Sequence, residues 1–168
     1  MEILNLVQGS PDWYAARKGC FCASEAAAAM GVSKYQTRDE LLHQKHTGLA
    51  PEVDAAKQRL FDAGHAAEAG ARAIAEQIAD TEFAPLVGVE TIEGMPLLAS
   101  FDGIDMMGET PWENKLWSQS LVAQVEAGEL EPHYWAQLEH QLIVSGAERV
   151  LFTTSDGTPE GTHPLWYE

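Results

Sequence analysis

The periodicity of the apolar residues changes once along this chain, near residue 80, and this change limits the folds open to it. Before it, the Ala-rich stretch from Pro51 to Ala79 has a helical pattern, with a break expected near Gly64. After it come three short, mixed apolar runs separated by turn residues: EFAPLVGVE, PLLASFDGID and PWENKLWS. These runs predict a meander of three strands.

Capping residues divide the first part of the chain into shorter helices. A Ser or Thr precedes each helical stretch, and Pro11 occupies the first helical position of the first one. A glycine closes each stretch. The predicted N-caps are Ser10, Ser24 and Thr37, and the closing glycines are Gly19, Gly31 and Gly48.

The last part of the chain adds a helix from Pro132 to Val144, ended by Gly146, then the strand RVLFTT and a final HPLWYE. Helices, three strands, a helix and a strand predict an α/β (α+β) fold with a central mixed sheet flanked by helices. We expect one domain over residues 1–168, with N-terminal helices at 10–79 and the sheet and catalytic core at 81–168.

Composition is that of an ordinary soluble globular protein, with 45% hydrophobic residues and a mean hydropathy of −0.20. No apolar run approaches the roughly 20 residues of a membrane span. The N-terminus lacks the pattern of a signal peptide, so we expect a cytoplasmic protein. Cys20 and Cys22 are too close in sequence for a disulfide that would link distant segments, and two cysteines are too few for a closed zinc site. We therefore expect reduced, partly buried thiols.

A net charge of −16 argues against a nucleic-acid partner. The basic residues are unevenly spread, however, because seven of the ten lie at or before Arg59. A local basic face is compatible with an acidic whole, and an acidic soluble protein with no such face is the alternative.

Asp102, Glu113 and Lys115 form the constellation that carries chemistry. Glu113 and Lys115 are two residues apart, so on a strand they share a face, and a hairpin turn at MMGETP brings Asp102 beside them. Two carboxylates with a backbone carbonyl suit Mg²⁺, and a lysine can position water or stabilise a phosphate. This D…(D/E)-x-K pattern of a large nuclease superfamily is weak alone, since a surface salt bridge on an edge strand also explains it.

Further blocks, in order, make the pattern specific. They are QGSPDWYAARKGCFCASEAAAAMGVSKY, TGLAPEV with GHAAEAGARA, ASFDGID, ENK and YWAQLEHQLIVSG. Together they resemble the YqaJ-like viral recombinase family, which contains nucleases of the bacteriophage lambda exonuclease type. Phe101 stands where that family usually has Pro. The resemblance implies a restriction-endonuclease-like core.

The resemblance also implies the role of each matching residue. Asp102, Glu113 and the Asn114 carbonyl would bind Mg²⁺, with Mn²⁺ as a substitute and two ions per site. Lys115 would be the catalytic lysine. Glu68, on the helix after Gly64, would face the metal or its waters, and Gln137 would lie beside the site.

A second group would hold the 5′-terminal phosphate of DNA: Arg17, Ser24, Ser100 and Tyr134. An arginine with a hydroxyl at a helix N-terminus is a good phosphate site. A surface charge for Arg17, a plain N-cap for Ser24 and a solvated residue for Glu68 are the ordinary alternatives.

The activity that the resemblance implies is 5′→3′ digestion of one strand of linear double-stranded DNA. The 3′ single-stranded tail would pass to a single-strand annealing protein, and the nuclease would form a homotrimeric ring. Members of the family continue with a further helix, whereas this chain stops at LWYE, so we expect either a shortened member or a fragment.

Three other functions compete with this one. The first is a non-catalytic DNA-end binder or recombination assembly factor with the same fold. The second is an endonuclease or repair nuclease of the same superfamily, from which a 5′-phosphate pocket would distinguish an exonuclease. The third, a helical carboxylate–histidine metalloprotein using His65, Glu68, His133 and His140, lacks the paired Glu-x-x-His motifs of such bundles.

Overall fold

The computed structural model describes residues 1–48 and 54–168, without the side chain of Lys57. Predictions about residues 49–53, including a helix start at Pro51, lie outside the described part. The chain divides into two compact units. The described part of unit 1 comprises residues 1–48, 85–101 and 131–146, and that of unit 2 comprises residues 54–84, 102–130 and 147–168.

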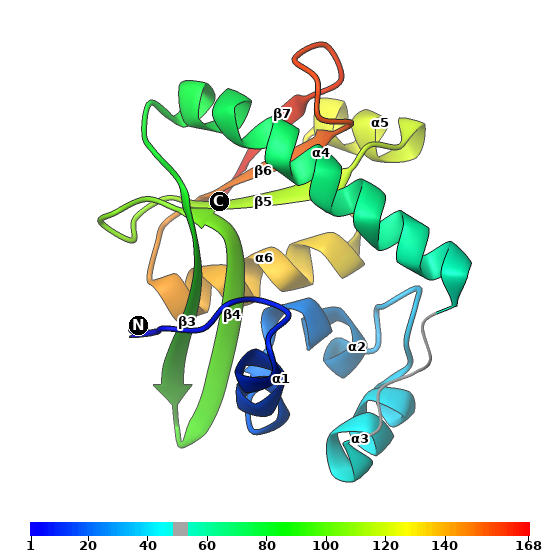
Figure 1. Cartoon of the computed structure of the whole chain (residues 1–168), viewed down its shortest axis with the longest axis vertical. Helices are drawn as coiled ribbons and strands as arrows, with labels where there is room; N and C mark the ends of the chain where they lie inside the picture. Colours follow the sequence, from blue (N-terminus) through cyan, green and yellow to red (C-terminus); the bar gives the residue numbers. More distant parts are fainter. Residues whose placement is uncertain (49–53) are drawn as a thin grey trace. The chain divides into compact units, whose positions relative to one another are not determined.

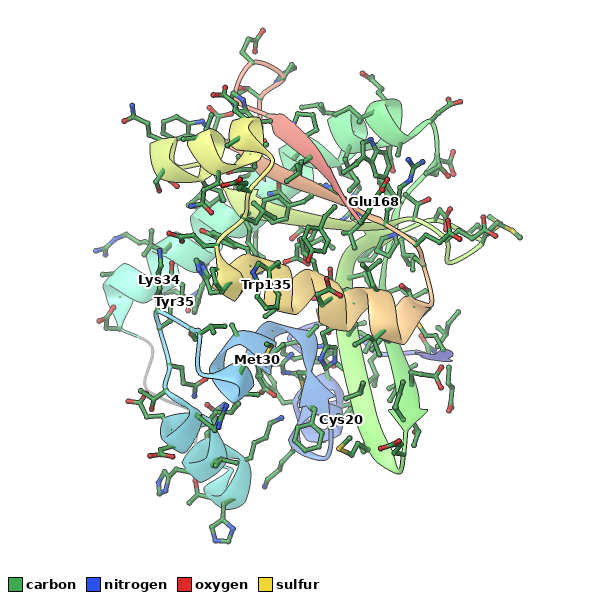
Figure 2. All side chains as sticks on the ribbon, turned by 180° about the vertical axis from the view of Figure 1, so that it is seen from behind. Cys20, Met30, Lys34, Tyr35, Trp135 and Glu168 are labelled. Atoms are coloured by element: carbon green, nitrogen blue, oxygen red, sulfur yellow. The ribbon has the colours of Figure 1, made fainter. Side chains whose placement is uncertain are left out.

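Unit 1 holds the first helices and one later helix (Figure 1). Its helices are α1 (Pro11–Lys18), the 3₁₀ turn η1 (Ala23–Glu25), α2 (Ala26–Met30), α3 (Arg38–Thr47) and α6 (Pro132–Ser145). Its strands are β1 (Glu2–Leu4), β2 (Phe21–Cys22) and most of β3 (Ala84–Ile92) and β4 (Met95–Ile104). Figure 2 shows Met30 at the end of α2 and Trp135 on α6.

Two of the three predicted helix starts are confirmed. Ser10 accepts a hydrogen bond from the Trp13 amide at 3.2 Å, and Thr37 forms a capping box with Glu40. The prediction for Ser24 is wrong, because α2 begins at Ala26 and Ser24 lies inside η1. The Ser24 hydroxyl bonds to an arginine instead of capping the helix.

Unit 2 contains α4 (Ala55–Ala79), β5 (Pro111–Leu116), α5 (Gln119–Ala127), β6 (Val150–Ser155) and β7 (His163–Tyr167). The expected break at Gly64 is absent from the described residues, since α4 runs through it as one helix. Sequence reasoning did not assign β1, β2 or α5. These are short elements of three, two and nine residues, too short for a strong periodic signal.

Within the residues that the structure describes, seven strands make one mixed sheet, in the order β1-β3-β4-β5-β6-β7 with β2 beside β4. The consecutive order of β3, β4 and β5 confirms the predicted meander. Strand β5 pairs antiparallel with β4 and parallel with β6, and β6 pairs antiparallel with β7. The predicted α/β fold with a central mixed sheet is therefore confirmed.

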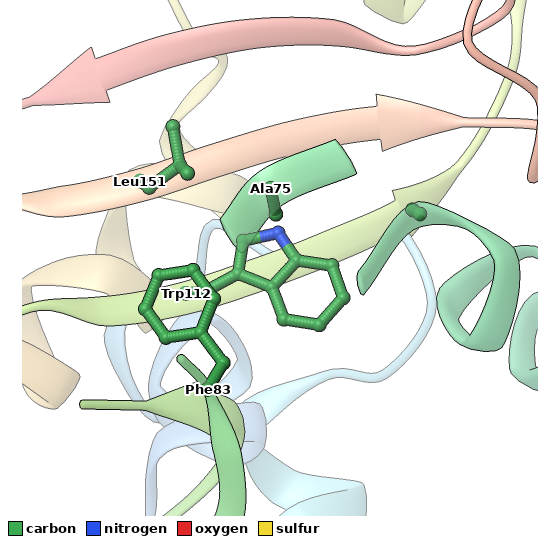
Figure 3. Packing of buried hydrophobic residues seen from close by; sticks show 5 residues of the cluster. Ala75, Phe83, Trp112 and Leu151 are labelled. Carbon is green, nitrogen blue, oxygen red and sulfur yellow. The ribbon is translucent and has the colours of Figure 1, made fainter. Parts of the chain in front are cut away.

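Each unit has its own apolar cluster. In unit 1, Cys22, Val87 and Leu98 are buried together. In unit 2, α4 contributes Ala71 and Ala75 to a cluster with Phe83, Trp112 and Leu151 (Figure 3). The rings of Phe83 and Trp112 stack with centroids 5.8 Å apart.

Gly103 is confined by this cluster, because a Cβ there would lie 2.7 Å from the Cβ of Phe83 and 2.9 Å from the Cε3 of Trp112. The glycine that follows Asp102 thus lets β4 and β5 meet beside the tryptophan. Both cysteines are free thiols, Cys22 buried and Cys20 partly so, as predicted. Over the residues that the structure describes, none of the helices has the length and apolar character needed to span a membrane.

Candidate active site

The ends of β4 and β5 bring the predicted carboxylates together in unit 2. Gly103 pairs with Trp112 in the antiparallel register, and Asp102 and Glu113 are the next residues along the two strands. The backbone N–H of Asn114 donates to Asp102 Oδ2 at 2.8 Å. A single hydrogen bond therefore fixes the Asp102 carboxylate against the strand that carries Glu113.

Glu113 affects the electrostatic environment of the Asp102 carboxyl. Burial raises the pKa of Asp102 well above its usual range, and the charge of Glu113 raises it further. Lys115 and the Asn114 N–H act in the opposite direction. The Glu113 side chain is 3% exposed, so this negative charge is held away from water, where it interacts strongly with its neighbours.

Lys115 lies on the same strand and forms an ion pair with Glu113, as the spacing of the two residues predicts. The Lys115 side chain is 30% exposed. Strand β5 lies between β4 and β6, so this pair is not the surface salt bridge on an edge strand that offered an ordinary explanation. A nearly buried carboxylate on an inner strand is costly to keep, which favours a functional role for it.

Glu68 on α4 belongs to the same electrostatic environment. Burial raises its pKa most, the Arg72 charge lowers it, and Glu113 adds a smaller upward effect. Arg72 binds Glu68 Oε1 at 3.0 Å one helical turn away, donates to the Phe83 carbonyl at 3.3 Å and lies 5.2 Å from the Trp112 ring. Arg72 thus links Glu68 to the cluster that supports β5.

A buried chain of hydrogen bonds ties β5 to β6. The Trp112 indole Nε1–H donates to Thr153 Oγ1 at 2.9 Å, and the Thr153 hydroxyl donates to Asn114 Oδ1 at 2.8 Å. Trp112 and Thr153 are fully buried and Asn114 is 7% exposed. These hydrogen bonds fix Trp112 and Asn114, the residues on either side of Glu113 in the sequence.

The residues present fit a divalent cation, because Asp102 and Glu113 are adjacent carboxylates whose mutual repulsion a cation would relieve. Within residues 1–48 and 54–168, no group of three or more His, Cys, Asp or Glu side chains has the arrangement of a metal site. A cation held here would need additional oxygen ligands from the backbone or water, as Mg²⁺ commonly takes.

The predicted phosphate-binding residues Arg17, Ser24 and Ser100 form a connected cluster in unit 1. Arg17 Nη2 donates to Ser24 Oγ at 3.0 Å. The Arg17 guanidinium lies 4.5 Å from the Trp13 ring, and the Trp13 indole N–H donates to Ser100 Oγ at 2.8 Å. Trp13 therefore connects the two serines through the arginine.

Sequence reasoning missed three members of this cluster: Trp13, Glu25 and Lys45. Glu25 lies 3.3 Å from Arg17 Nη2 and 2.7 Å from Lys45 Nζ. Trp13 occurs in the quoted opening block, and its spacing of four residues from Arg17 on a helix places the two side chains on one face. Lys45 comes from α3 and offers no local signal.

Tyr134 and Gln137 lie on α6 in unit 1, whereas the carboxylates belong to unit 2. Tyr134 packs against the His133 ring with centroids 3.8 Å apart. Both residues are partly buried. Their predicted roles beside the metal and the phosphate stay predictions.

Comparison with solved structures defines the class of protein. An alkaline exonuclease from Laribacter hongkongensis, LHK-Exo, has a TM-score of 0.71 and 27% identity, covering 95% of this chain and 82% of that one. A second crystal structure of LHK-Exo, in complex with dAMP, has a TM-score of 0.71 and 26% sequence identity, and it also covers 95% of this chain and 82% of that one. A structure of SSO0001 shares the fold at a TM-score of 0.54 and 15% identity, over 96% of this chain and 79% of that one. The fold is that of the alkaline exonucleases.

The family follows from the sequence itself. The sequence profile of the YqaJ-like viral recombinase domain matches residues 12–148, and the chain belongs to this family. A search of curated proteins gave no significant match. The resemblance predicted from the ordered blocks is thereby confirmed.

Proposed function

We propose that this protein is a Mg²⁺-dependent 5′→3′ exonuclease that digests one strand of linear double-stranded DNA and leaves 3′ single-stranded tails for recombination. The observation that carries the proposal is the adjacent pair of carboxylates Asp102 and Glu113, with Lys115 ion-paired to Glu113, on inner strands of a recombinase-family fold. LHK-Exo, a structural neighbour, was crystallised with dAMP, a mononucleotide of the kind that such digestion releases.

Asp102, Glu113 and the Asn114 carbonyl would hold the metal, with Glu68 bound through water to it or to a second ion. When bound, Mg²⁺ or its substitute Mn²⁺ polarises the phosphoryl group and favours ionisation of water. The Asn114 N–H holds Asp102 in place. The Lys115 ammonium, which is ion-paired with Glu113, would position the attacking water or stabilise negative charge on the phosphate.

The reaction is hydrolysis of the phosphodiester bond that follows the 5′-terminal nucleotide. A water oxygen forms a bond to phosphorus, the bond from phosphorus to the 3′-oxygen breaks, and that oxygen takes a proton. The water's proton passes to solvent. The products are a 5′-mononucleotide with a 3′-hydroxyl and a strand that carries a new 5′-phosphate.

The Arg17 cluster supports the choice of an exonuclease over an endonuclease, since a pocket for a terminal phosphate serves an enzyme that works from ends. Arg17 and Ser24 are hydrogen-bonded to each other, and Ser100 joins them through Trp13. We propose that these residues hold the 5′-phosphate, with Tyr134 contributing from α6, and that Gln137 lies beside the catalytic site.

We also propose a homotrimeric ring and transfer of the tail to a single-strand annealing protein. The early position of seven of the ten basic residues supports a basic channel inside an acidic assembly. Light scattering should give three times the chain mass of 18.3 kDa, and a strict monomer at working concentration would contradict the ring.

The test of function uses a linear duplex with 5′-phosphates, labelled at the 5′ end or the 3′ end of one strand, beside a covalently closed circle of the same sequence. With Mg²⁺, the 5′ label should appear first as mononucleotide while the 3′ label stays in long products. The circle should remain intact. Cutting of the circle would indicate an endonuclease, and binding to ends without digestion in Mg²⁺ or Mn²⁺ would indicate a DNA-end-binding protein.

A further inference from the structure

Glu25 lies at the centre of an ion-pair cluster in unit 1. Its Oε1 is 3.3 Å from Arg17 Nη2, and its Oε2 is 2.7 Å from Lys45 Nζ and accepts a 3.3 Å hydrogen bond from the Cys22 amide. The Glu25 side chain is 12% exposed. Both oxygens of this carboxylate are therefore engaged with donors that converge from different segments.

Lys45 restrains the same arginine from another direction. Its ammonium donates to the carbonyls of Arg17 and Cys20, both at 2.7 Å. Arg17 is in the last turn of α1 and Cys20 lies just beyond the helix, so the ammonium is at the C-terminal end of α1, where a positive charge is favourable. Lys45 belongs to α3, so it fixes the end of the helix that carries Arg17 and also holds Glu25 in place.

The Arg17 guanidinium is thus confined on several sides. It lies over the Trp13 ring, and its bonds to Ser24 and Glu25 both come from Nη2. Within the described part of the chain, these bonds leave the Nε and Nη1 donors for a ligand. A cavity of about 220 Å³ adjoins the cluster and is lined by Trp13, Arg17, Lys18, Glu25 and Lys45, among others.

We infer that Glu25, held by Lys45, is a positioning residue that fixes Arg17 for a terminal DNA phosphate and so gives the enzyme its preference for 5′-phosphorylated ends. This inference rests on the proposed exonuclease function. The charges explain why the pair is needed: Glu25 alone would neutralise Arg17, whereas Arg17, Lys45 and Glu25 together keep one net positive charge. The arginine is restrained without loss of attraction for phosphate.

Positioning and simple charge make opposite predictions for Glu25→Ala. Removal of the carboxylate makes the cluster more positive, so charge alone would increase the preference for a 5′-phosphate. Loss of positioning should decrease it, because a mobile arginine must be ordered when the phosphate binds. The sign of the change therefore separates the two effects.

The experiment measures the ratio of initial digestion rates on duplexes with 5′-phosphate and 5′-hydroxyl ends, for the full chain with Mg²⁺. We expect Glu25→Ala and Lys45→Met to reduce this ratio about tenfold, a change that corresponds to about 1.4 kcal/mol. Lys45→Arg should recover part of it. Asp39→Ala, which removes an exposed carboxylate of the same unit, should not reduce it.

Glu25→Gln has the same shape as the native residue and serves if Glu25→Ala fails to fold; thermal unfolding identifies that case. It should also reduce the ratio, by a smaller factor. Suppose that Arg17→Ala abolishes the preference for 5′-phosphorylated ends, but a folded Glu25 variant has an unchanged or increased rate ratio. This result would overturn the role of Glu25 and leave the 5′-phosphate site in place. If the wild type shows no preference, or Arg17→Ala leaves it intact, the proposed 5′-phosphate site itself is wrong and this inference falls with it.

Discussion

The backbone N–H of Asn114 donates to the carboxylate of Asp102 at 2.8 Å, which ties the two strands of the candidate metal site together. The bond lowers the pKa of Asp102, but burial and the Glu113 charge outweigh it. Without a cation, this aspartate is therefore a destabilising group once it is ionised.

Asp102→Asn should stabilise the metal-free protein at neutral pH. A carboxyl whose pKa is raised by folding contributes stability at acid pH and loses it as the pH rises through the folded-state pKa. The gain in Tm should thus grow from acid to neutral pH, at about 2–4 °C for each kcal/mol in a chain of this size. Calorimetry at several pH values measures it.

Without Mg²⁺, Asp102→Asn should have the higher Tm, and with Mg²⁺ the wild type should have the higher Tm. The cation binds the native state of the wild type and so raises its Tm, but it does little for Asp102→Asn. Asp62→Asn, an exposed aspartate on α4, is the matched control and should respond to Mg²⁺ as the wild type does. Equal Mg²⁺ responses of Asp102→Asn and the wild type would exclude Asp102 as a ligand.

Activity should rise with pH beyond the ordinary range of carboxyl titration. The pKa values of Asp102 and Glu68 are both raised, mainly by burial, and a carboxyl must lose its proton to bind a metal. Protons and Mg²⁺ therefore compete, so a higher Mg²⁺ concentration should move the rising limb of the rate profile to lower pH. Initial rates at two Mg²⁺ concentrations test this, and a limb that stays fixed would contradict it.

Gly103→Ala should destabilise the fold by about 1–3 kcal/mol, because its Cβ would press on Phe83 and Trp112. The matched control is Gly64→Ala on α4, where a Cβ meets nothing within 4 Å. That change should stabilise the protein by about 0.4–1 kcal/mol. Denaturant unfolding of both variants gives the change in the free energy of unfolding for each. A loss of stability for Gly64→Ala would show that α4 needs its glycine there.

Cys22 should resist thiol reagents in the native protein. Burial is the main cause that raises its pKa to about 12, and the side chain is 1% exposed. Since the thiolate is the reactive form, labelling of Cys22 near pH 8 should be about a thousandfold slower than in the unfolded chain. The Cys20→Ser variant isolates Cys22 for this measurement, and rapid labelling would indicate local opening around β2.

The sequence predicted those parts of the fold whose signals are local. Ser10, Thr37 and the spacing of Glu113 and Lys115 each act through neighbours within a few residues, and the structure bears out these contacts. Ser24 has the residue type of an N-cap, but its hydroxyl bonds to Arg17, seven residues away. The two-residue strand β2 depends on pairing with Leu97 and Leu98, which no local pattern encodes.

For the candidate site, too, the sequence predicted some residues and missed those that reach the site from distant parts of the chain. The residue types and order predicted Asp102, Glu113 and Lys115, and the resemblance added Glu68, Arg17, Ser24 and Ser100. Lys45 escaped prediction because it reaches the end of α1 from 28 residues away. Thr153, which completes the hydrogen-bond chain to Asn114, comes from β6 and is 39 residues from its partner.

The most direct test of the proposed function is digestion of the linear, 5′-phosphorylated, end-labelled duplex with Mg²⁺ by the wild type and by Lys115→Ala. Circular dichroism and Mg²⁺-induced stabilisation first establish that the variant folds and retains its carboxylates. We predict stepwise release of 5′-mononucleotides by the wild type and a loss of at least about a hundredfold in the variant. Undiminished digestion by a folded Lys115→Ala would contradict the assignment of this site.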